Sequence, residues 1–412
     1  MDSGGEADDR RARLWEVAKL FLRLGATAFG GPAVHIALME EEIVRRRKWL
    51  TAEELLDLVG ATNLIPGPNS TELAIHIGYR RAGNAGLLLA GACFILPAAL
   101  LTAVFAVIYE RYRFIPQVGA ILYGLKPAIL GIIAAAVIRL GRTALKSDAK
   151  RWISIVAFTV ALAGSLAGGD ELLVLFGAGG LGILYSAFRA RGNKPPNATE
   201  TPAPAPASKP KTNGFIAALP MLSGAGAATA APSATLLALT LYFLKIGSVL
   251  YGSGYVLVSF LRGDLVLERG WISEQQLIDA VAVGQATPGP VFTTATFIGY
   301  LLHGPAGAAL ATIAIFIPSF ALVRLTSPFV ARLRKSAVLG GFLDGVNAGS
   351  LGLLAAVLGT LAAIALEGWP AYIIGALGVA AALIPKLNPT WVLLGGAVAG
   401  LLVSAAGLAP PP

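Results

Sequence analysis

The sequence is poor in the residue types that build disulfides, metal sites and clusters. Cys93 is the only cysteine, which excludes disulfides within the chain, iron–sulfur clusters and zinc–thiolate sites. Three scattered histidines, His35, His76 and His303, are atypical of a metal centre. The chain carries no cofactor-binding motif either. We therefore expect a protein without metal or cofactor, and not an enzyme.

Charged residues are also scarce, at 13% of the chain against 56% hydrophobic residues. A soluble domain cannot hide so much apolar surface behind so few charges, so the composition predicts a polytopic membrane protein. The apolar runs have helix length and lack the alternating pattern of a barrel, so the fold class is all-α. Residues 1–13 are polar and lead directly into the first helix, so secretory cleavage is not expected. The net charge of +9 lies in short loops, as in membrane proteins generally, and does not indicate a nucleic-acid partner.

The two halves of the chain repeat each other. The stretch "FLRLGATAFGG" from Phe21 aligns with "FLKIGSVLYGS" from Phe243. The same offset in numbering relates Pro66-Gly67-Pro68 to Pro288-Gly289-Pro290, and after a single deletion the register continues from Gly78 to Gly299 and beyond. Chance does not hold such a register over so long a stretch, so we infer a duplication.

The domain organisation follows from this repeat. A stretch rich in Pro, Ala and Thr, "PPNATETPAPAPASKP", separates the halves and is typical of a flexible cytoplasmic linker. The predicted units are a cytoplasmic tail (1–13), the first repeat (14–189), the linker (190–213), an additional transmembrane helix (214–232) and the second repeat (233–412).

Two helices of each repeat are interrupted. In the first repeat, residues 14–29 end at Gly30-Gly31-Pro32 and residues 33–44 continue; Thr51 and Glu54 form a capping box for a helix that ends at Pro66-Gly67-Pro68. Residues 69–79 restart it, and ordinary spans follow at about 84–108, 116–140, 152–167 and 171–188. Basic clusters at every end of the broken segments favour re-entrant hairpins over single crossings.

The charge pattern is reversed in the second repeat. The positions that match Arg45–Lys48 have lost most of their basic residues, whereas the loop with Arg332, Arg334 and Lys335 has gained them. Loops that are cytoplasmic in one half therefore match external loops in the other. The pattern predicts an inverted-topology repeat, for which residues 214–232 supply the additional crossing.

Inverted repeats with broken helices are typical of secondary transporters. A helix that restarts inside the membrane presents free N–H groups and the positive end of its dipole, which favours an anion. Such restarts follow Gly31-Pro32, Pro68, Gly254 and Pro290. We expect the four to surround one anion site near the midplane.

Intramembrane cations and polar side chains belong to the same hypothesis. Arg23 and its counterpart Lys245 lie within apolar runs, where a charge is costly and is functional or paired; snorkelling or an ion pair with Glu16 or another acid is the alternative. Lys126 is a one-sided third cation, since Asn347 matches it. The expected substrate-binding residues are Arg23, Gly30, Gly31, Asn63, Gly67, Asn69, Ser70, Thr71, Lys126, Lys245, Gly252, Gln285, Gly289, Thr293 and Thr294. For any single hydroxyl or amide, capping of the broken backbone is the simpler role.

Three titratable groups lie close to the breaks. Glu72 and His76, one turn apart, are candidates for carrying a coupling proton, with a neutral, hydrogen-bonded or Arg23-paired glutamate as the alternative. His35 lies just past the first break, where the second repeat has Leu257. The acidic run that ends at Glu42 is expected to be a solvated helix face.

The combination resembles the chromate ion transporter (CHR) family in its long two-domain form. The resemblance rests on "FGGPAVHI", on "RKWLTAEELLDLVGATNLIPGPNSTELAIHIGYRRAG" and on the second copy with "GQATPGPVFTTATFIGY". It implies a multi-pass transporter of the bacterial inner membrane that exports chromate and confers resistance, coupled to sulfate exchange or to the proton-motive force. The second copy departs from the pattern in reading "YGSGYVL", without the proline of "FGGPAVH".

Several alternatives remain open at this stage. Sulfate or another oxyanion has the charge and shape of chromate, so an importer or exchanger of such ions is the nearest one. Matched re-entrant hairpins also suit an anion channel, and an intramembrane chromate reductase is a third alternative. The expected partners are chromate, sulfate and the lipid bilayer, with a homodimer left open.

Overall fold

The protein is almost entirely helical in the part that the computed structural model describes, residues 3–29, 31–112, 115–144, 151–192, 234–251, 256–327, 337–384 and 387–408. The first half contains α1 (Ser3–Thr27), α2 (Pro32–Glu40), η1 (Glu41–Arg46), α3 (Ala52–Thr62), α4 (Asn69–Tyr112), α5 (Pro116–Ala144), α6 (Arg151–Leu166) and α7 (Glu171–Gly192). The second half contains α8 (Leu236–Val249), α9 (Leu257–Phe260), η2 (Leu261–Glu268), α10 (Glu274–Ala286), η3 (Val291–Thr293), α11 (Thr294–Thr326), α13 (Ala337–Ala365), α14 (Gly368–Leu383) and α15 (Pro389–Ala405). These ranges include no strand, which confirms the all-α prediction.

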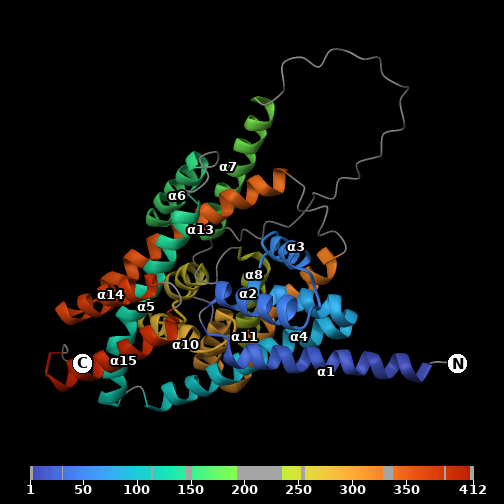
Figure 1. Cartoon of the computed structure of the whole chain (residues 1–412). Coiled ribbons are helices and arrows are strands. Elements are labelled where there is room, and N and C mark those ends of the chain that lie inside the picture. The colour runs from blue at the N-terminus through green and yellow to red at the C-terminus, as the bar shows by residue number, and fades with distance from the viewer. Residues whose placement is uncertain are drawn as a thin grey trace.

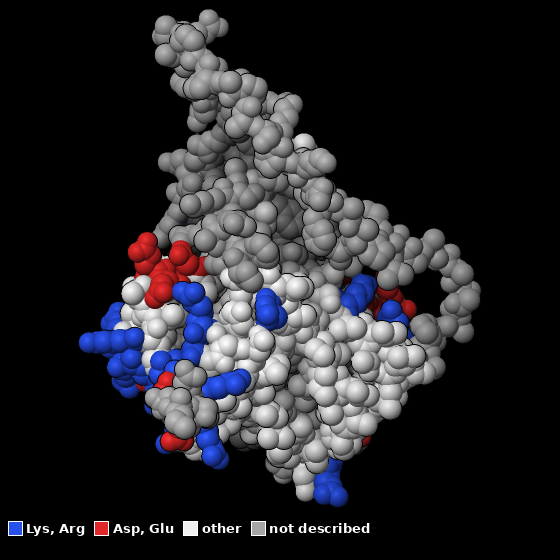
Figure 2. Space-filling model, turned by 90° about the vertical axis from the view of Figure 1, so that its right-hand side faces the viewer, with Lys and Arg blue, Asp and Glu red and all other residues white. Residues whose placement is uncertain are grey.

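Five of the described helices are long and apolar enough to cross a membrane. The surface also indicates a membrane protein, because tryptophans near the ends of apolar helices are exposed, as is typical of membrane interfaces. Trp152, Trp369 and Trp391 are 74%, 62% and 66% exposed. Figure 2 shows one face on which a broad uncharged area borders a cluster of Lys and Arg with Asp and Glu beside it. The chain is a multi-pass membrane protein.

The predicted capping box at the start of α3 is confirmed. The Thr51 hydroxyl accepts from the Glu54 N–H at 3.1 Å, and the Glu54 carboxylate accepts from the Thr51 N–H at 2.9 Å. Ser273 and Gln276 form the same box at the start of α10, the matching helix of the second half. Both helices therefore begin with two of their otherwise unpaired N–H groups satisfied.

Helix α4 consists of two antiparallel pieces. The backbone leaves the helical region at Ala82 and Gly83, and α11 does the same at His303 and Gly304. Before this turn, residues 69–81 extend only about 20 Å, less than the roughly 30 Å hydrocarbon core. The pieces pack closely, since a Cβ on Gly78 would lie 2.3 Å from the Gly86 carbonyl oxygen.

The helices form two groups (Figure 1). One group holds the broken segments: α1 packs on α4, α8 packs on α11, and α4 packs on α11. In the other group, helices of one half pack against helices of the other half: α5 packs on α14 and α15, and α13 packs on α6 and α7. Glycines allow these close approaches, as at Gly124, where a Cβ would lie 2.0 Å from the Gly396 carbonyl oxygen.

Some predictions fall outside the described residues. These are residues 193–213 of the linker, the additional helix at 214–232, Gly30, Gly252, Gly254 and the cluster of Arg332, Arg334 and Lys335. The first three residues predicted for the linker, 190–192, belong to α7 instead.

Candidate functional site

Three of the four predicted helix restarts meet at one small cavity. It is lined by the starts of α2, α4 and the η3–α11 segment, namely Pro32, His35, Pro68, Asn69, Ser70, Pro290, Val291 and Phe292. Its volume is about 10 Å³, which is no more than one water molecule needs. A tetrahedral oxyanion fits only if the three segments move apart.

Each restart leaves backbone donors unused. The first N–H groups to bond back to the Pro68 carbonyl are those of Thr71, at 2.8 Å, and Glu72, at 3.1 Å. The N–H groups of Asn69 and Ser70 precede that first turn and have no acceptor within the helix. At the other break, Thr293 is the first to bond back to Pro290, at 3.1 Å. Two helix N-termini, one from each repeat, therefore present donors and dipoles to the same cavity.

The two breaks are tied to the opposite repeats by matched hydrogen bonds. The Gly67 N–H donates to the Leu250 carbonyl at 2.8 Å, and the Gly289 N–H donates to the Ala28 carbonyl at 2.9 Å. In the alignment of the two repeats, Leu250 is the counterpart of Ala28 and Gly289 is the counterpart of Gly67, so the two bonds are exchanged copies of each other. Both glycines have positive φ, 135° and 87°. The predicted breaks are thus also the points where the halves hold each other.

His35 is the titratable side chain on this cavity. It is 1% exposed, its Nε2 lies 3.0 Å from the Ala28 carbonyl oxygen, and its ring forms a T-shaped contact with that of Phe94. Its Nδ1 is buried without a hydrogen-bond partner. The sequence placed His35 near a break, but only the fold places it on the cavity.

The predicted hydroxyls and amides divide between cavity and caps. Asn69 and Ser70 line the cavity, and the Asn69 amide also donates to the Asn63 side chain at 2.7 Å. The Thr293 and Thr294 hydroxyls donate to the Pro290 and Val291 carbonyls, so they act as caps of the broken backbone. The Thr71 hydroxyl and the Gln285 amide nitrogen are buried without a partner and do not line the cavity. Gly31 caps α2 with φ 81°.

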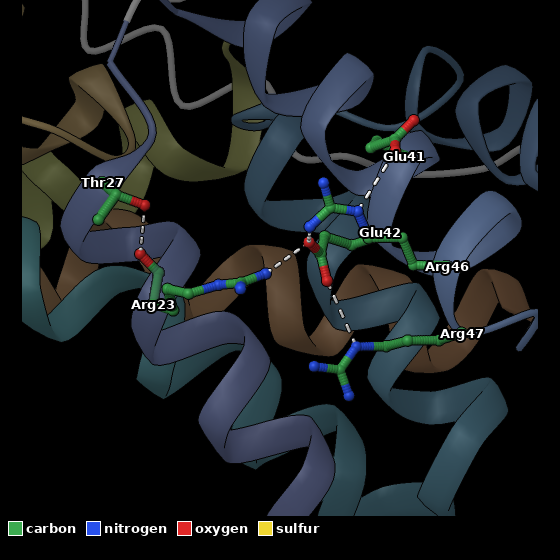
Figure 3. Close-up of polar contacts among 6 residues, drawn as sticks. All are labelled: Arg23, Thr27, Glu41, Glu42, Arg46 and Arg47. Carbon is green, nitrogen blue, oxygen red and sulfur yellow. Dashed lines mark hydrogen bonds and ion pairs between the residues drawn. The ribbon is translucent and has the colours of Figure 1, made fainter.

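Arg23 forms an ion pair away from this cavity (Figure 3). Its guanidinium lies 2.7 Å from the Glu42 carboxylate, which also contacts Arg46 at 3.0 Å and Arg47 at 3.5 Å. Burial alone would raise the pKa of Glu42, but Arg23 and the two neighbouring arginines bring it below its ordinary value. Glu42 is 7% exposed, so the expectation of a solvated acidic face is wrong at this position.

Lys245 repeats this arrangement in the second half. Its ammonium lies 3.6 Å from the Asp264 carboxylate, and Asp264 is the counterpart of Glu42 in the alignment of the repeats. Both cationic side chains are about half exposed, 50% for Arg23 and 44% for Lys245. The sequence held a signal for these ion pairs, because one offset in numbering relates Arg23 to Lys245 and Glu42 to Asp264. The sequence alone does not show, however, that each cation contacts the acid of the segment that follows it.

Glu72 and His76 lie at the contact between the repeats. Glu72 is fully buried, its Oε1 accepts a long hydrogen bond of 3.4 Å from Ser319 on α11, and its Oε2 has no partner. The His76 Nδ1 lies 3.1 Å from the Ser327 hydroxyl. Neither residue lines the cavity, although a Cβ on Gly67 would lie 2.3 Å from the Glu72 carboxylate.

Lys126 belongs to a second, open cavity of about 420 Å³ between α5 and the start of α10. Lys126 is the only cation among its lining residues, which include Ser273, Gln276 and Asp279. The Asp279 carboxylate accepts from the Tyr109 hydroxyl at 2.8 Å. The structure thus separates Lys126 from the cavity of the helix breaks.

Comparison with known proteins gives a consistent family. The family model described as "Chromate transporter" matches residues 15–183 and 237–401. The "Probable chromate transport protein" of Synechococcus elongatus is 30% identical, with 94% of this chain and 95% of that protein covered. The "Chromate transport protein" of Cupriavidus metallidurans is also 30% identical over 94% of this chain and 93% of its own, and that of Pseudomonas aeruginosa is 31% identical over 93% and 91%. No solved structure matches the chain. With both halves matched by one family model and relatives covered almost end to end, the chain belongs to the chromate transporter family.

Proposed function

We propose that the protein is a secondary transporter that exports chromate across the inner membrane and so confers resistance to it. The observation that carries the proposal is the meeting of three helix N-termini, from both repeats, at one small cavity. Their unused N–H groups and dipoles attract a compact anion, although no positively charged side chain lines the cavity among the described residues. The relatives named as chromate transport proteins support chromate as that anion.

The proposed cycle moves one repeat against the other, which we take to be inverted. The cavity is smaller than a tetrahedral oxyanion, which suits a closed state between two open ones. The matched bonds from Gly67 to Leu250 and from Gly289 to Ala28 cross between the repeats next to the cavity. When the protein opens to one side of the membrane, we expect one of these two hydrogen bonds to lengthen first, because the entering anion pushes the helix breaks apart.

The predicted cations receive separate roles in this scheme. Arg23 and Lys245 have carboxylate partners, so we propose that they brace the hairpins and attract the anion only at a distance. Lys126 is proposed to bind the anion briefly in the open cavity, before it reaches the cavity of the helix breaks; this role is called the outer stop. Glu72 and His76, buried at the contact between the repeats, are candidates for a coupling proton against which other titratable groups are tested.

Transport into inverted membrane vesicles tests the proposal. Vesicles that contain the protein should accumulate more chromate than vesicles without it. The rate of accumulation should saturate with chromate concentration and fall when sulfate is added. Ser70→Val places a methyl group in the cavity and should abolish accumulation. Ser154→Val, at a buried serine on α6, is the matched control and should leave it intact.

The same vesicles separate the alternatives. Accumulation of sulfate without chromate would assign the protein to sulfate. Currents beyond carrier turnover in a planar bilayer would make it a channel, and a change in the valence of chromium would make it a reductase. Equal accumulation with Ser70→Val and with Ser154→Val would remove the cavity as the binding site.

A further inference from the structure

Among the eight described residues that line the cavity, His35 is the one that is both titratable and almost completely buried. Phe94, which contacts the His35 ring, and the other seven residues that line the cavity carry no charge. Any charge that appears on His35 therefore acts on the cavity without a competing group.

The hydrogen bond to Ala28 fixes which ring nitrogen carries the proton. A backbone carbonyl only accepts, so Nε2 must be the donor in the 3.0 Å contact. In the neutral ring, Nδ1 then holds a lone pair, and this nitrogen has no partner. A lone pair repels the oxygen of an anion, whereas a protonated Nδ1 donates a charge-assisted hydrogen bond to it.

A dianion in this cavity lacks a positive counterpart. The cavity offers backbone N–H groups, one amide and one hydroxyl. Arg23 and Lys245 are bound to carboxylates elsewhere, and Lys126 lies in the other cavity. Burying an unpaired charge is costly. A proton on His35 removes the repulsion at Nδ1 and supplies the missing charge in one step.

We propose that His35 takes up one proton from the aqueous phase whenever the anion binds, so that the protein carries the proton and the dianion together. This rests on the proposed function. The Ala28 carbonyl that holds Nε2 also accepts from Gly289 at the break of the second repeat. Protonation strengthens the donor at Nε2 as well, which ties the charge on His35 to the bond between the repeats.

The device is one-sided. The second repeat has Leu257 at the position of His35, and the Leu250 carbonyl accepts from Gly67 with no imidazole beside it. Only the first repeat can therefore take up the proton at this position, on His35.

Calorimetry of the purified full-length protein tests the proposal. Chromate is titrated in a mildly alkaline medium, where it is the dianion, in two buffers that differ in ionisation enthalpy. The difference in heat gives the number of protons taken up per anion bound. We expect about one for the unmodified protein and an apparent Kd that rises up to about tenfold per pH unit.

His35→Gln is the decisive variant, because glutamine keeps a donor for the Ala28 carbonyl but does not titrate. It should bind chromate with no proton uptake and with a Kd that does not depend on pH. His35→Leu, the residue of the second repeat, should lose the uptake as well and guards against a folding defect in one variant. His303→Gln, at the turn in α11, is the matched control and should keep it.

Proton uptake that persists in His35→Gln would overturn the proposal, as would its absence from the unmodified protein. Its loss in Glu72→Gln or His76→Gln with retention in His35→Gln would assign the proton to the contact between the repeats. No binding of chromate or sulfate by the unmodified protein would instead remove the proposed function, and this inference with it.

Discussion

Replacement of Gly67 by alanine tests the strained turn at the break Pro66-Gly67-Pro68. The φ of Gly67 is 135°, a region that residues with a Cβ avoid at a cost of about 1–3 kcal/mol. The added methyl group would also lie 2.3 Å from the Glu72 carboxylate and 2.6 Å from the Ser319 hydroxyl. Overpacking of this kind costs about 1–3 kcal/mol. Together the two costs predict a destabilisation of about 4 kcal/mol.

Gly83→Ala isolates the two contributions. Gly83 has φ 63°, ψ −149° and open space around the position of a Cβ, so alanine there meets only the cost of a backbone conformation that essentially only glycine adopts, about 1–3 kcal/mol. Both variants would be unfolded thermally in the same detergent, with retained monodispersity as the readout and the unmodified protein alongside. Gly67→Ala should lose its fold at a clearly lower temperature than Gly83→Ala. Equal midpoints would show that Glu72 and Ser319 move aside freely, and the close contact behind the break would then be wrong.

Three further predictions concern charge and caps. Arg23 and Glu42 do not line the cavity, so Arg23→Gln and Arg23→Gln/Glu42→Gln should both transport with an apparent KM within about twofold of the unmodified protein. A KM increase of about tenfold or more in both variants would restore Arg23 to the binding site. Lys126→Gln should slow uptake at low chromate and low ionic strength and have no effect at high salt, because steering of an anion is screened; a salt-independent loss would contradict a role as an outer stop. Thr51→Ala and Ser273→Ala should each destabilise the fold by about 1 kcal/mol through loss of an N-cap, and unchanged thermal midpoints for both would show that the caps are redundant with packing.

The sequence was sufficient for the features that depend on local chemistry. Proline cannot continue a helix and glycine adopts positive φ, so the break at Pro66-Gly67-Pro68 and the start of α4 follow from the residues alone. The capping residues Thr51 and Glu54 gave the start of α3 for the same reason. The duplication is a property of the sequence itself.

Only the tertiary structure decided which of these features meet. Arg23 and Lys245 looked like a symmetric pair for one anion, and the fold places each against an acid, Glu42 and Asp264. Burial and pairing depend on how distant segments pack, which no local pattern encodes. His35 is the converse case: a lone histidine after a break is ambiguous in the sequence. Its contact with the Ala28 carbonyl, beside the Gly289 N–H of the other repeat, exists only because the two halves pack break against break.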